Sequence, residues 1–268
     1  MVRKSHTPEQ VINKLREAEV TTMKNKLPEH IAIIPDGNRR WAEKRGLPKL
    51  MGHHAGAKKM RTVVEFLVDH HIKYLTVWGF STNNWTRSQD EISDLFHLLA
   101  TWIETDVPRL DTRGVRLRHI GRIAELPQYL QLAINQAVRL TQNNSGMTLT
   151  LAFNYSGQDE ILDAVRRLIA EILGGSCPVT FGGSIDEASP PYQLDKGQFS
   201  RYLDTAGMPD VDLVIRTAGE FRLSDFLIWQ TAYSEYYFTK VLWPDFDSKQ
   251  LEKALQAYSQ RVRRFGGG

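Results

Sequence analysis

Short apolar runs alternate along this chain with longer segments whose apolar residues recur every three or four positions. A run of four to eight apolar residues bounded by turn formers is typical of a buried strand, and the three- and four-residue spacing is typical of an amphipathic helix. Strands are predicted at 31–34, 72–80, 115–120, 147–153 and 211–215, with a further short strand at 226–229. Helices are predicted at 54–70, 92–110, 126–141, 159–173 and 248–261. This alternation favours an α/β fold with a parallel sheet that is covered on both faces.

The chain of 268 residues shows no internal repeat and no second apolar core, so we expect a single domain. We assign residues 27–268 to this domain and the polar residues 1–26 to an extension that is helical or disordered. Residues 6–20 also resemble the opening of some transposases, but the match is too short for a DNA-binding domain. The segment 174–198 is rich in Gly, Ser and Pro and is predicted to be a loop.

Charge and composition argue against several classes of protein. A formal net charge of +3 gives no reason to expect a nucleic-acid partner. No apolar run approaches the roughly 18 residues of a membrane-spanning helix, and the N-terminus lacks an apolar signal core. The single cysteine, Cys177, cannot form an internal disulfide and is typical of a reducing compartment. We therefore expect a cytoplasmic protein, which could still act on a lipid at a membrane surface.

Two segments end predicted strands abruptly with charged and small residues. The first contains Asp36-Gly-Asn-Arg-Arg40, and the second runs from Arg216 to Ser224. Because ligands bind beyond the carboxyl ends of strands in an open parallel sheet, we expect the two segments to share one site. Glycine permits close approach to an anion, arginine binds phosphate, and Mg²⁺ takes one or two carboxylates together with substrate phosphates. The pattern predicts a site for a phosphate-rich ligand and Mg²⁺, with Asp36 at the metal; a plain turn with solvated arginines is the alternative.

Three further motifs carry polar chemistry. The segment Gly52-His-His-Ala-Gly56 is predicted to open a helix and to form a second anion site with His53 as a donor. The segment from Phe80 to Arg87 follows a strand and suits a mobile lid. Glu235 stands among aromatic residues, where a carboxylate needs a metal or an arginine as its partner. Each motif also has a plainer interpretation. The first would be a helix cap, the second an Asx-rich turn, and the aromatic residues around Glu235 a core or dimer contact.

Taken in order, these motifs resemble those of the cis-prenyltransferase family. The resemblance extends from about residue 30 to residue 267 and takes in five further segments: Asn154-Tyr155, Arg216-Thr-Ala-Gly-Glu220, Tyr233-Ser-Glu235, Trp243-Pro-Asp-Phe246 and Arg264-Phe-Gly-Gly267. It implies a homodimer with a six-stranded parallel sheet, flanking helices and an apolar tunnel. It also implies that isopentenyl diphosphate is joined to an allylic diphosphate, such as farnesyl diphosphate, with a new cis double bond. The chain contains no Asp-Asp-x-x-Asp motif, which separates it from the trans-prenyltransferases.

The resemblance implies roles for individual residues. Asp36 and Asn84 match catalytic positions, and Asp36 and Glu235 match ligands of Mg²⁺. Isopentenyl diphosphate would bind to Arg216, Arg222 and Ser224. The other implied substrate-binding residues are Gly37, Asn38, Arg39, Arg40, Trp41, Lys49, His53, Ser81, Trp85 and Arg87.

Three positions, Asn83, Lys49 and Ala218, depart from the commoner family pattern and leave the product length open. Undecaprenyl-type elongation is the main interpretation, with contact at the membrane periphery for product release. One alternative is a short-chain Z-prenyl diphosphate synthase. The other is a non-catalytic subunit that depends on a partner, although such subunits lack parts of the diphosphate cradle that this chain keeps.

Overall fold

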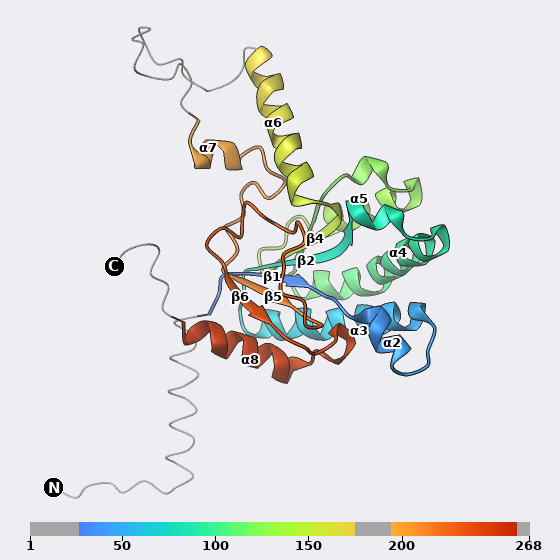
Figure 1. Ribbon diagram of the computed structural model, residues 1–268. Coiled ribbons are helices and arrows are strands. Elements are labelled where there is room, and N and C mark those ends of the chain that lie inside the picture. Colours follow the sequence, from blue (N-terminus) through green and yellow to red (C-terminus); the bar gives the residue numbers. More distant parts are fainter. Residues whose placement is uncertain (1–26, 175–193, 262–268) are drawn as a thin grey trace, which may run out of the picture.

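A six-stranded sheet forms the centre of the protein (Figure 1). The computed structural model describes residues 27–174 and 194–261. The strands, in the order in which they occur along the chain, are β1 His30–Ile34, β2 Tyr74–Ser81, β3 Arg116–Ile120, β4 Thr148–Tyr155, β5 Leu213–Arg216 and β6 Glu235–Phe238. They lie side by side in the order β3-β4-β2-β1-β5-β6, and every neighbouring pair is parallel. The prediction of a single α/β domain with a parallel six-stranded sheet is confirmed.

Helices connect the strands and cover the sheet. The α-helices are α2 Asn38–Glu43, α3 Lys49–Asp69, α4 Gln89–Thr112, α5 Gln128–Leu140, α6 Gly157–Leu173, α7 Lys196–Ser200 and α8 Ser248–Ser259. Short 3₁₀ helices occur at η1 Thr82–Thr86, η2 Ile123–Glu125 and η3 Trp243–Asp245. Within the described ranges, no helix combines the length and the apolar character that a membrane crossing requires.

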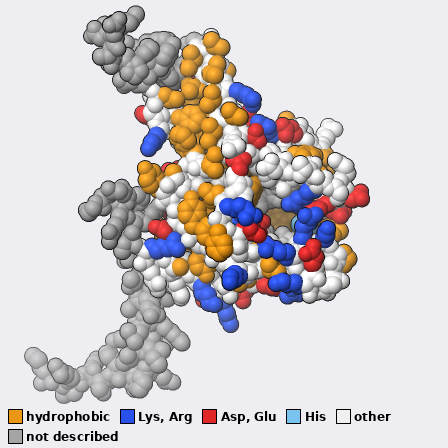
Figure 2. All heavy atoms as spheres, in the orientation of Figure 1, with side chains coloured by type: hydrophobic (Ala, Val, Ile, Leu, Met, Phe, Trp, Pro, Cys, Tyr) orange, Lys and Arg blue, Asp and Glu red, His pale blue; other side chains and the backbone are white. Residues whose placement is uncertain are grey.

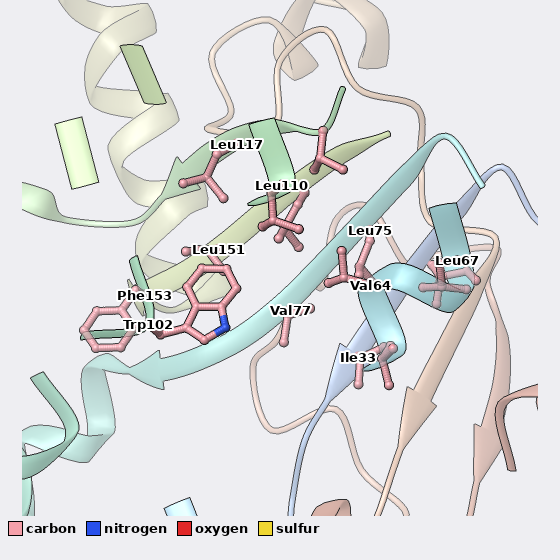
Figure 3. Close-up of a cluster of buried hydrophobic side chains, with 14 of the residues drawn as sticks. Ile33, Val64, Leu67, Leu75, Val77, Trp102, Leu110, Leu117, Leu151 and Phe153 are labelled. Carbon is pink, nitrogen blue, oxygen red and sulfur yellow. The ribbon is translucent and has the colours of Figure 1, made fainter. Parts of the chain in front are cut away.

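The main hydrophobic core lies between one face of the sheet and the helices α3, α4, α5 and α8. Figure 3 shows how Val64 and Leu67 of α3 lie close to Ile33 and Leu75 of the sheet. Successive side chains of a strand point to opposite faces, so Ile33 enters this core whereas Ile34 enters a second cluster on the other face.

The second face of the sheet is covered largely by the connection between β5 and β6. Phe226 and Leu227 are fully buried there. The prediction of a strand at 226–229 is therefore wrong: the segment forms turns, and Leu227 has a left-handed backbone with φ 48°. The apolar run reflects burial of a loop against the sheet, and the sixth strand is instead β6, at the edge of the sheet.

Two larger differences from prediction concern helices. Helix α3 begins at Lys49, directly after Pro48, so the segment from Gly52 to Gly56 lies inside the helix rather than at its start. Helix α7 begins at Lys196, within the predicted loop 174–198. Residues 175–193 and 1–26 lie outside the described residues, and the predictions made for them stay predictions.

Candidate active site

A cavity of about 530 Å³ opens beyond the carboxyl ends of β1, β2 and β5. Figure 2 shows a hollow on the same face of the protein, rimmed by Lys and Arg side chains. The polar end of the cavity brings together eleven of the residues proposed from the sequence: Asp36, Gly37, Asn38, Arg39, Arg40, His53, Ser81, Asn84, Arg87, Arg216 and Ser224. Segments that are far apart in the chain therefore meet in one site, as expected for strand ends of a parallel sheet.

Asp36 and Arg216 form an ion pair at the floor of the polar end. The guanidinium of Arg216 donates to Oδ2 of Asp36 from Nε at 2.9 Å and from Nη2 at 2.7 Å. Its third nitrogen, Nη1, donates to the Ser224 hydroxyl at 2.9 Å and to the main-chain oxygen of Arg222. The Arg216 side chain is 5% exposed and that of Asp36 is 36% exposed, so the carboxylate remains open to a ligand while the arginine is held in place.

The turn after β1 depends on a glycine. Gly37 has φ 105°, and a Cβ there would come within 2.9 Å of the side chains of Ala218 and Leu242. Ala218 itself has φ 71°, a conformation that favours glycine, at one of the positions where the chain departs from the family pattern. The tight turn lets helix α2 start immediately beside Asp36.

The two glycines of the Gly52–Gly56 segment allow close packing of α3 against α2, and the anion site predicted there stays a prediction. A Cβ on Gly52 would lie 2.0 Å from the main-chain oxygen of Asn38, and one on Gly56 would lie 2.4 Å from Oδ1 of Asn38. The two glycines stand one turn apart on α3 and so form a groove that receives the start of α2. His53 lies between them and lines the cavity.

His53 is neutral near pH 7. Burial, reinforced by the positive charge of Arg87, lowers its pKa to about 4, although Glu91 opposes the shift. A neutral imidazole keeps one N–H donor for a phosphate oxygen. The predicted donor role is therefore compatible with the structure, but it does not rely on a positive charge.

Unpartnered polar atoms concentrate at this cavity. Among the described residues, five buried side-chain nitrogen or oxygen atoms lack a hydrogen-bond partner, and four belong to residues that line it: Asn38 Oδ1, Arg39 Nε, His53 Nε2 and Trp102 Nε1. A buried polar group without a partner costs about 1–3 kcal/mol. Such a cluster is typical of a site whose ligand supplies the missing partners.

The predicted lid forms a defined 3₁₀ helix. Ser81 and Asn84 cap its start reciprocally: the Ser81 hydroxyl accepts from the main chain of Asn83 at 3.2 Å, and Oδ1 of Asn84 accepts from the main chain of Ser81 at 3.0 Å. This contact fixes the orientation of the Asn84 amide, whose N–H groups can donate to a ligand. Trp85 points away from the cavity lining; its indole donates to Asn154 at 2.8 Å and packs edge-on against Phe80.

The inner end of the cavity is apolar. Helices α3 and α4 and the sheet provide its walls through Ala57, Met60, Val77, Phe80, Leu95, Leu98, Leu99, Trp102, Leu151 and Phe153. Trp102 is the largest of these side chains and is 7% exposed.

Five other residues proposed from the sequence do not line the cavity: Trp41, Lys49, Trp85, Arg222 and Glu235. Trp41 donates to Asp245 at 2.7 Å, and Arg45 lies over its ring. Arg222 pairs with Glu220 at 2.7 Å.

Glu235 lies at the amino-terminal end of the parallel strands, whereas Asp36 lies at their carboxyl-terminal end. Glu235 begins β6, where it is in register with the first residue of β5, whereas Asp36 follows the end of β1. Its carboxylate binds Arg261 at 2.5 Å, so an arginine is its partner in this structure.

The residues at the polar end fit a magnesium ion that is shared with a bound diphosphate. Asp36 is the only carboxylate among the residues that line the cavity. No group of three or more metal-binding side chains occurs in the ranges 27–174 and 194–261. Mg²⁺ commonly binds one or two carboxylates together with substrate phosphates, so a single carboxylate is sufficient.

Sequence reasoning missed Trp243, which is 1% exposed and lines the cavity. Its indole donates to the main-chain oxygen of Gly56 at 2.9 Å, and its main-chain nitrogen donates to the main-chain oxygen of Asp36 at 3.0 Å. The motif Trp243-Pro-Asp-Phe246 was noted only as part of the resemblance.

Comparison with known proteins identifies the family. The model of the undecaprenyl diphosphate synthase family (Prenyltransf) matches residues 34–266. The chain belongs to this family. An isoprenyl transferase of Clostridium perfringens is 43% identical over 93% of this chain and 94% of its own length. A protein of Photorhabdus laumondii named ditrans,polycis-undecaprenyl-diphosphate synthase, (2E,6E)-farnesyl-diphosphate specific, is 41% identical over 90% of each chain.

A solved structure supports the same assignment. The lavandulyl diphosphate synthase of Lavandula x intermedia, crystallised with dimethylallyl diphosphate, superposes with a TM-score of 0.83 at 36% identity, covering 90% of this chain and 99% of the other. The prediction that this chain is a prenyltransferase of the cis-prenyltransferase family is confirmed.

Proposed function

We propose that this protein extends an allylic prenyl diphosphate, such as farnesyl diphosphate, with isopentenyl diphosphate to give an undecaprenyl-type Z-polyprenyl diphosphate. The observation that carries the proposal is the division of one cavity into a cationic end and an apolar end. A prenyl diphosphate has the same division, with a polyanionic head and a hydrocarbon tail. The relative from Photorhabdus laumondii is named for the same farnesyl primer.

Ionisation of an allylic diphosphate leaves a carbocation and a departing diphosphate anion. Arg39, Arg87 and the neutral His53 are placed to bind that anion at the polar end. Preorganised donors and charges of this kind stabilise developing negative charge without further rearrangement. Mg²⁺, bound by Asp36 and the diphosphate oxygens, would supply further positive charge to the leaving group. The apolar walls exclude water, which would otherwise quench the cation.

We assign Arg216 and Ser224 to the isopentenyl diphosphate, because Asp36 and the neighbouring main chain hold Arg216 in a fixed orientation. Asn84 would donate from its amide N–H groups to a phosphate oxygen near the point of proton loss. Arg222 and Glu235 keep their proposed roles in substrate and metal binding, although this protomer places both beyond the cavity lining.

The experiment that tests the function is an incubation with labelled isopentenyl diphosphate, Mg²⁺ and either farnesyl or dimethylallyl diphosphate. A ladder of long Z-polyprenols after dephosphorylation supports the proposal. A single short product moves the protein to the short-chain class, and a branched product to the activity for which the lavandulyl relative is named. No turnover with any primer contradicts catalysis by this chain alone and favours the partner-dependent subunit.

We propose that two copies associate through helix α6. Four apolar side chains, Leu162, Val165, Ile169 and Leu173, form one stripe along this helix and are 53%, 36%, 49% and 82% exposed. Figure 2 shows hydrophobic side chains gathered along α6. A contiguous apolar stripe on a helix is typical of an interaction surface.

The association is tested by sedimentation of Ile169→Glu. A charge in the stripe is expected to convert a dimer to a monomer, whereas Glu171→Lys, about half a turn away, should leave the dimer intact. A wild-type protein that sediments as a monomer at micromolar concentration would contradict the proposal. We also propose a cytoplasmic enzyme that releases its lipid product at the membrane periphery; cell fractionation tests this location.

A further inference from the structure

Glu91 connects the cationic side chains of the polar end. It lies in the first turn of α4, outside the cavity lining, and its side chain is 14% exposed. One carboxylate oxygen, Oε2, accepts from Arg39 at 2.5 Å, and the other, Oε1, accepts from Arg87 at 3.1 Å. Nε2 of His53 lies 3.9 Å from Oε1. A single side chain therefore contacts residues from α2, α3 and the end of η1.

The two arginines would not hold this arrangement by themselves. Both arginines line the cavity, and their positive charges repel each other. Burial, together with the charge of Arg39, acts to lower the pKa of Arg87. Glu91 acts in the opposite direction through charge and a hydrogen bond. With one oxygen on each guanidinium, the carboxylate fixes the spacing between Arg39 and Arg87 before any ligand arrives.

We propose that Glu91 is a positioning residue, which holds Arg39 and Arg87 apart at the distance that a diphosphate group requires. This inference rests on the proposed function and adds to it a residue that touches neither substrate. Glu91 is not expected to bind Mg²⁺, because both of its oxygens are engaged by arginines. Substrate oxygens would instead be met by the remaining N–H groups of the arginines, such as the unpartnered Nε of Arg39.

The test compares Glu91→Gln and Glu91→Asp with a control, Asp90→Asn. Gln keeps the shape of the side chain but loses the charge, and Asp keeps the charge but is too short to span both arginines. Asp90 occupies the same first turn and is exposed, so its replacement removes an equal charge from the helix N-terminus without touching the cavity. Thermal unfolding confirms that each variant is folded.

The first readout is the affinity for inorganic diphosphate with Mg²⁺, measured by calorimetry. We expect Glu91→Gln to weaken binding by about tenfold or more, on the scale of one charge-assisted hydrogen bond. Glu91→Asp should fall between it and the wild type, and Asp90→Asn should match the wild type. If Glu91→Gln does not fold, Glu91→Asp carries the test. If a folded Glu91 variant binds diphosphate as tightly as the wild type or more tightly, the inference is overturned. Glu91 would then only compete with the diphosphate for Arg39 and Arg87.

The second readout is steady-state kinetics for each substrate. Replacement of a purely structural residue would affect both substrates equally. KM for the allylic diphosphate should rise in Glu91→Gln more than KM for isopentenyl diphosphate, whose site is formed around Arg216. Equal effects on both substrates overturn the inference. If the wild-type protein binds diphosphate but does not turn over substrate, only the proposed function is contradicted. The order of diphosphate affinities among the wild type and the Glu91 variants still decides the role of Glu91.

Discussion

Replacement of Asp36 separates two roles that its carboxylate has in this structure. It holds Arg216 through two contacts of 2.9 and 2.7 Å, and it is the only carboxylate that lines the cavity. Asp36→Ala removes both roles. Asp36→Asn keeps a neutral oxygen that can accept from Arg216 but removes the negative charge that a metal requires.

The expected effect on stability is small. Hydrogen bonds to charged groups contribute about 1.5–3 kcal/mol each. Arg216 keeps its contacts with Ser224 and the main chain of Arg222, and water can reach the position of a side chain that is 36% exposed. We therefore expect Asp36→Ala to lower the unfolding free energy by about 2 kcal/mol and Asp36→Asn by about 1 kcal/mol.

The expected effect on turnover is large for both variants. Loss of metal-assisted charge stabilisation worth about 4 kcal/mol corresponds to about a thousandfold fall in rate. The assay is incorporation of labelled isopentenyl diphosphate at saturating substrates, with Asp69→Asn as control, because Asp69 pairs with Arg113 away from the cavity. If Asp36→Asn turns over near the wild-type rate while Asp36→Ala does not, the carboxylate serves only to hold Arg216 and the metal assignment is refuted.

Three further predictions follow from the same cavity. Trp102→Ala enlarges the apolar end and should shift products to longer chains by chromatography; an unchanged distribution would show that Trp102 does not limit length. Because the pKa of His53 falls from 6.5 to about 4 on folding, its contribution to stability is present above pH 6.5 and is lost as the pH falls towards 4. His53→Gln should therefore reduce the loss of unfolding free energy between pH 7 and 4 by up to about 3 kcal/mol, measured by denaturant titration, and equal pH dependence would contradict the low pKa. Gly56→Ala places a Cβ 2.4 Å from Asn38 Oδ1 and should destabilise the fold by about 1–3 kcal/mol, whereas Gly197→Ala, with its nearest atom at 3.3 Å, should not.

The parts of this protein that sequence could predict are those with a local physical signature. The run Ile31–Ile34 is apolar at every position and is a central strand with helices on one face and a buried loop on the other. The polar residues that follow it, such as Asp36 and Asn38, could be placed at the carboxyl edge because parallel strands share that edge. The apolar run at 226–229 failed because burial of a loop and burial of a strand produce the same composition.

Contacts between distant segments had no such signature. The segment that contains glycines 52 and 56 suggested a second anion site, and only the packed structure shows that these glycines also accommodate Asn38. Trp85 seemed part of a lid, yet its indole joins η1 to Asn154 at the end of β4. All three residues belong to segments that are typical of substrate binding, and all three contact other segments of the fold.

The position of the cavity follows from the order of the strands. The chain moves from β1 to β2, then to β3 at the edge of the sheet and back to β4 between β3 and β2, before it crosses to β5 and β6 on the other side of β1. The connections that leave β1 and β5 therefore diverge, and a crevice opens between the strand ends where a ligand can reach main-chain and side-chain donors. Asp36 follows one of these strands and Arg216 ends the other, so their ion pair spans the crevice. The apolar half has a different origin, since α3 and α4 lie on one face only and leave a gap above β2 and β4. A diphosphate head at the crevice and a hydrocarbon tail beneath these helices would thus occupy one continuous cavity, and substitutions of the apolar α4 side chains that line it, such as Leu98 or Trp102, should change chain length without changing the affinity for inorganic diphosphate.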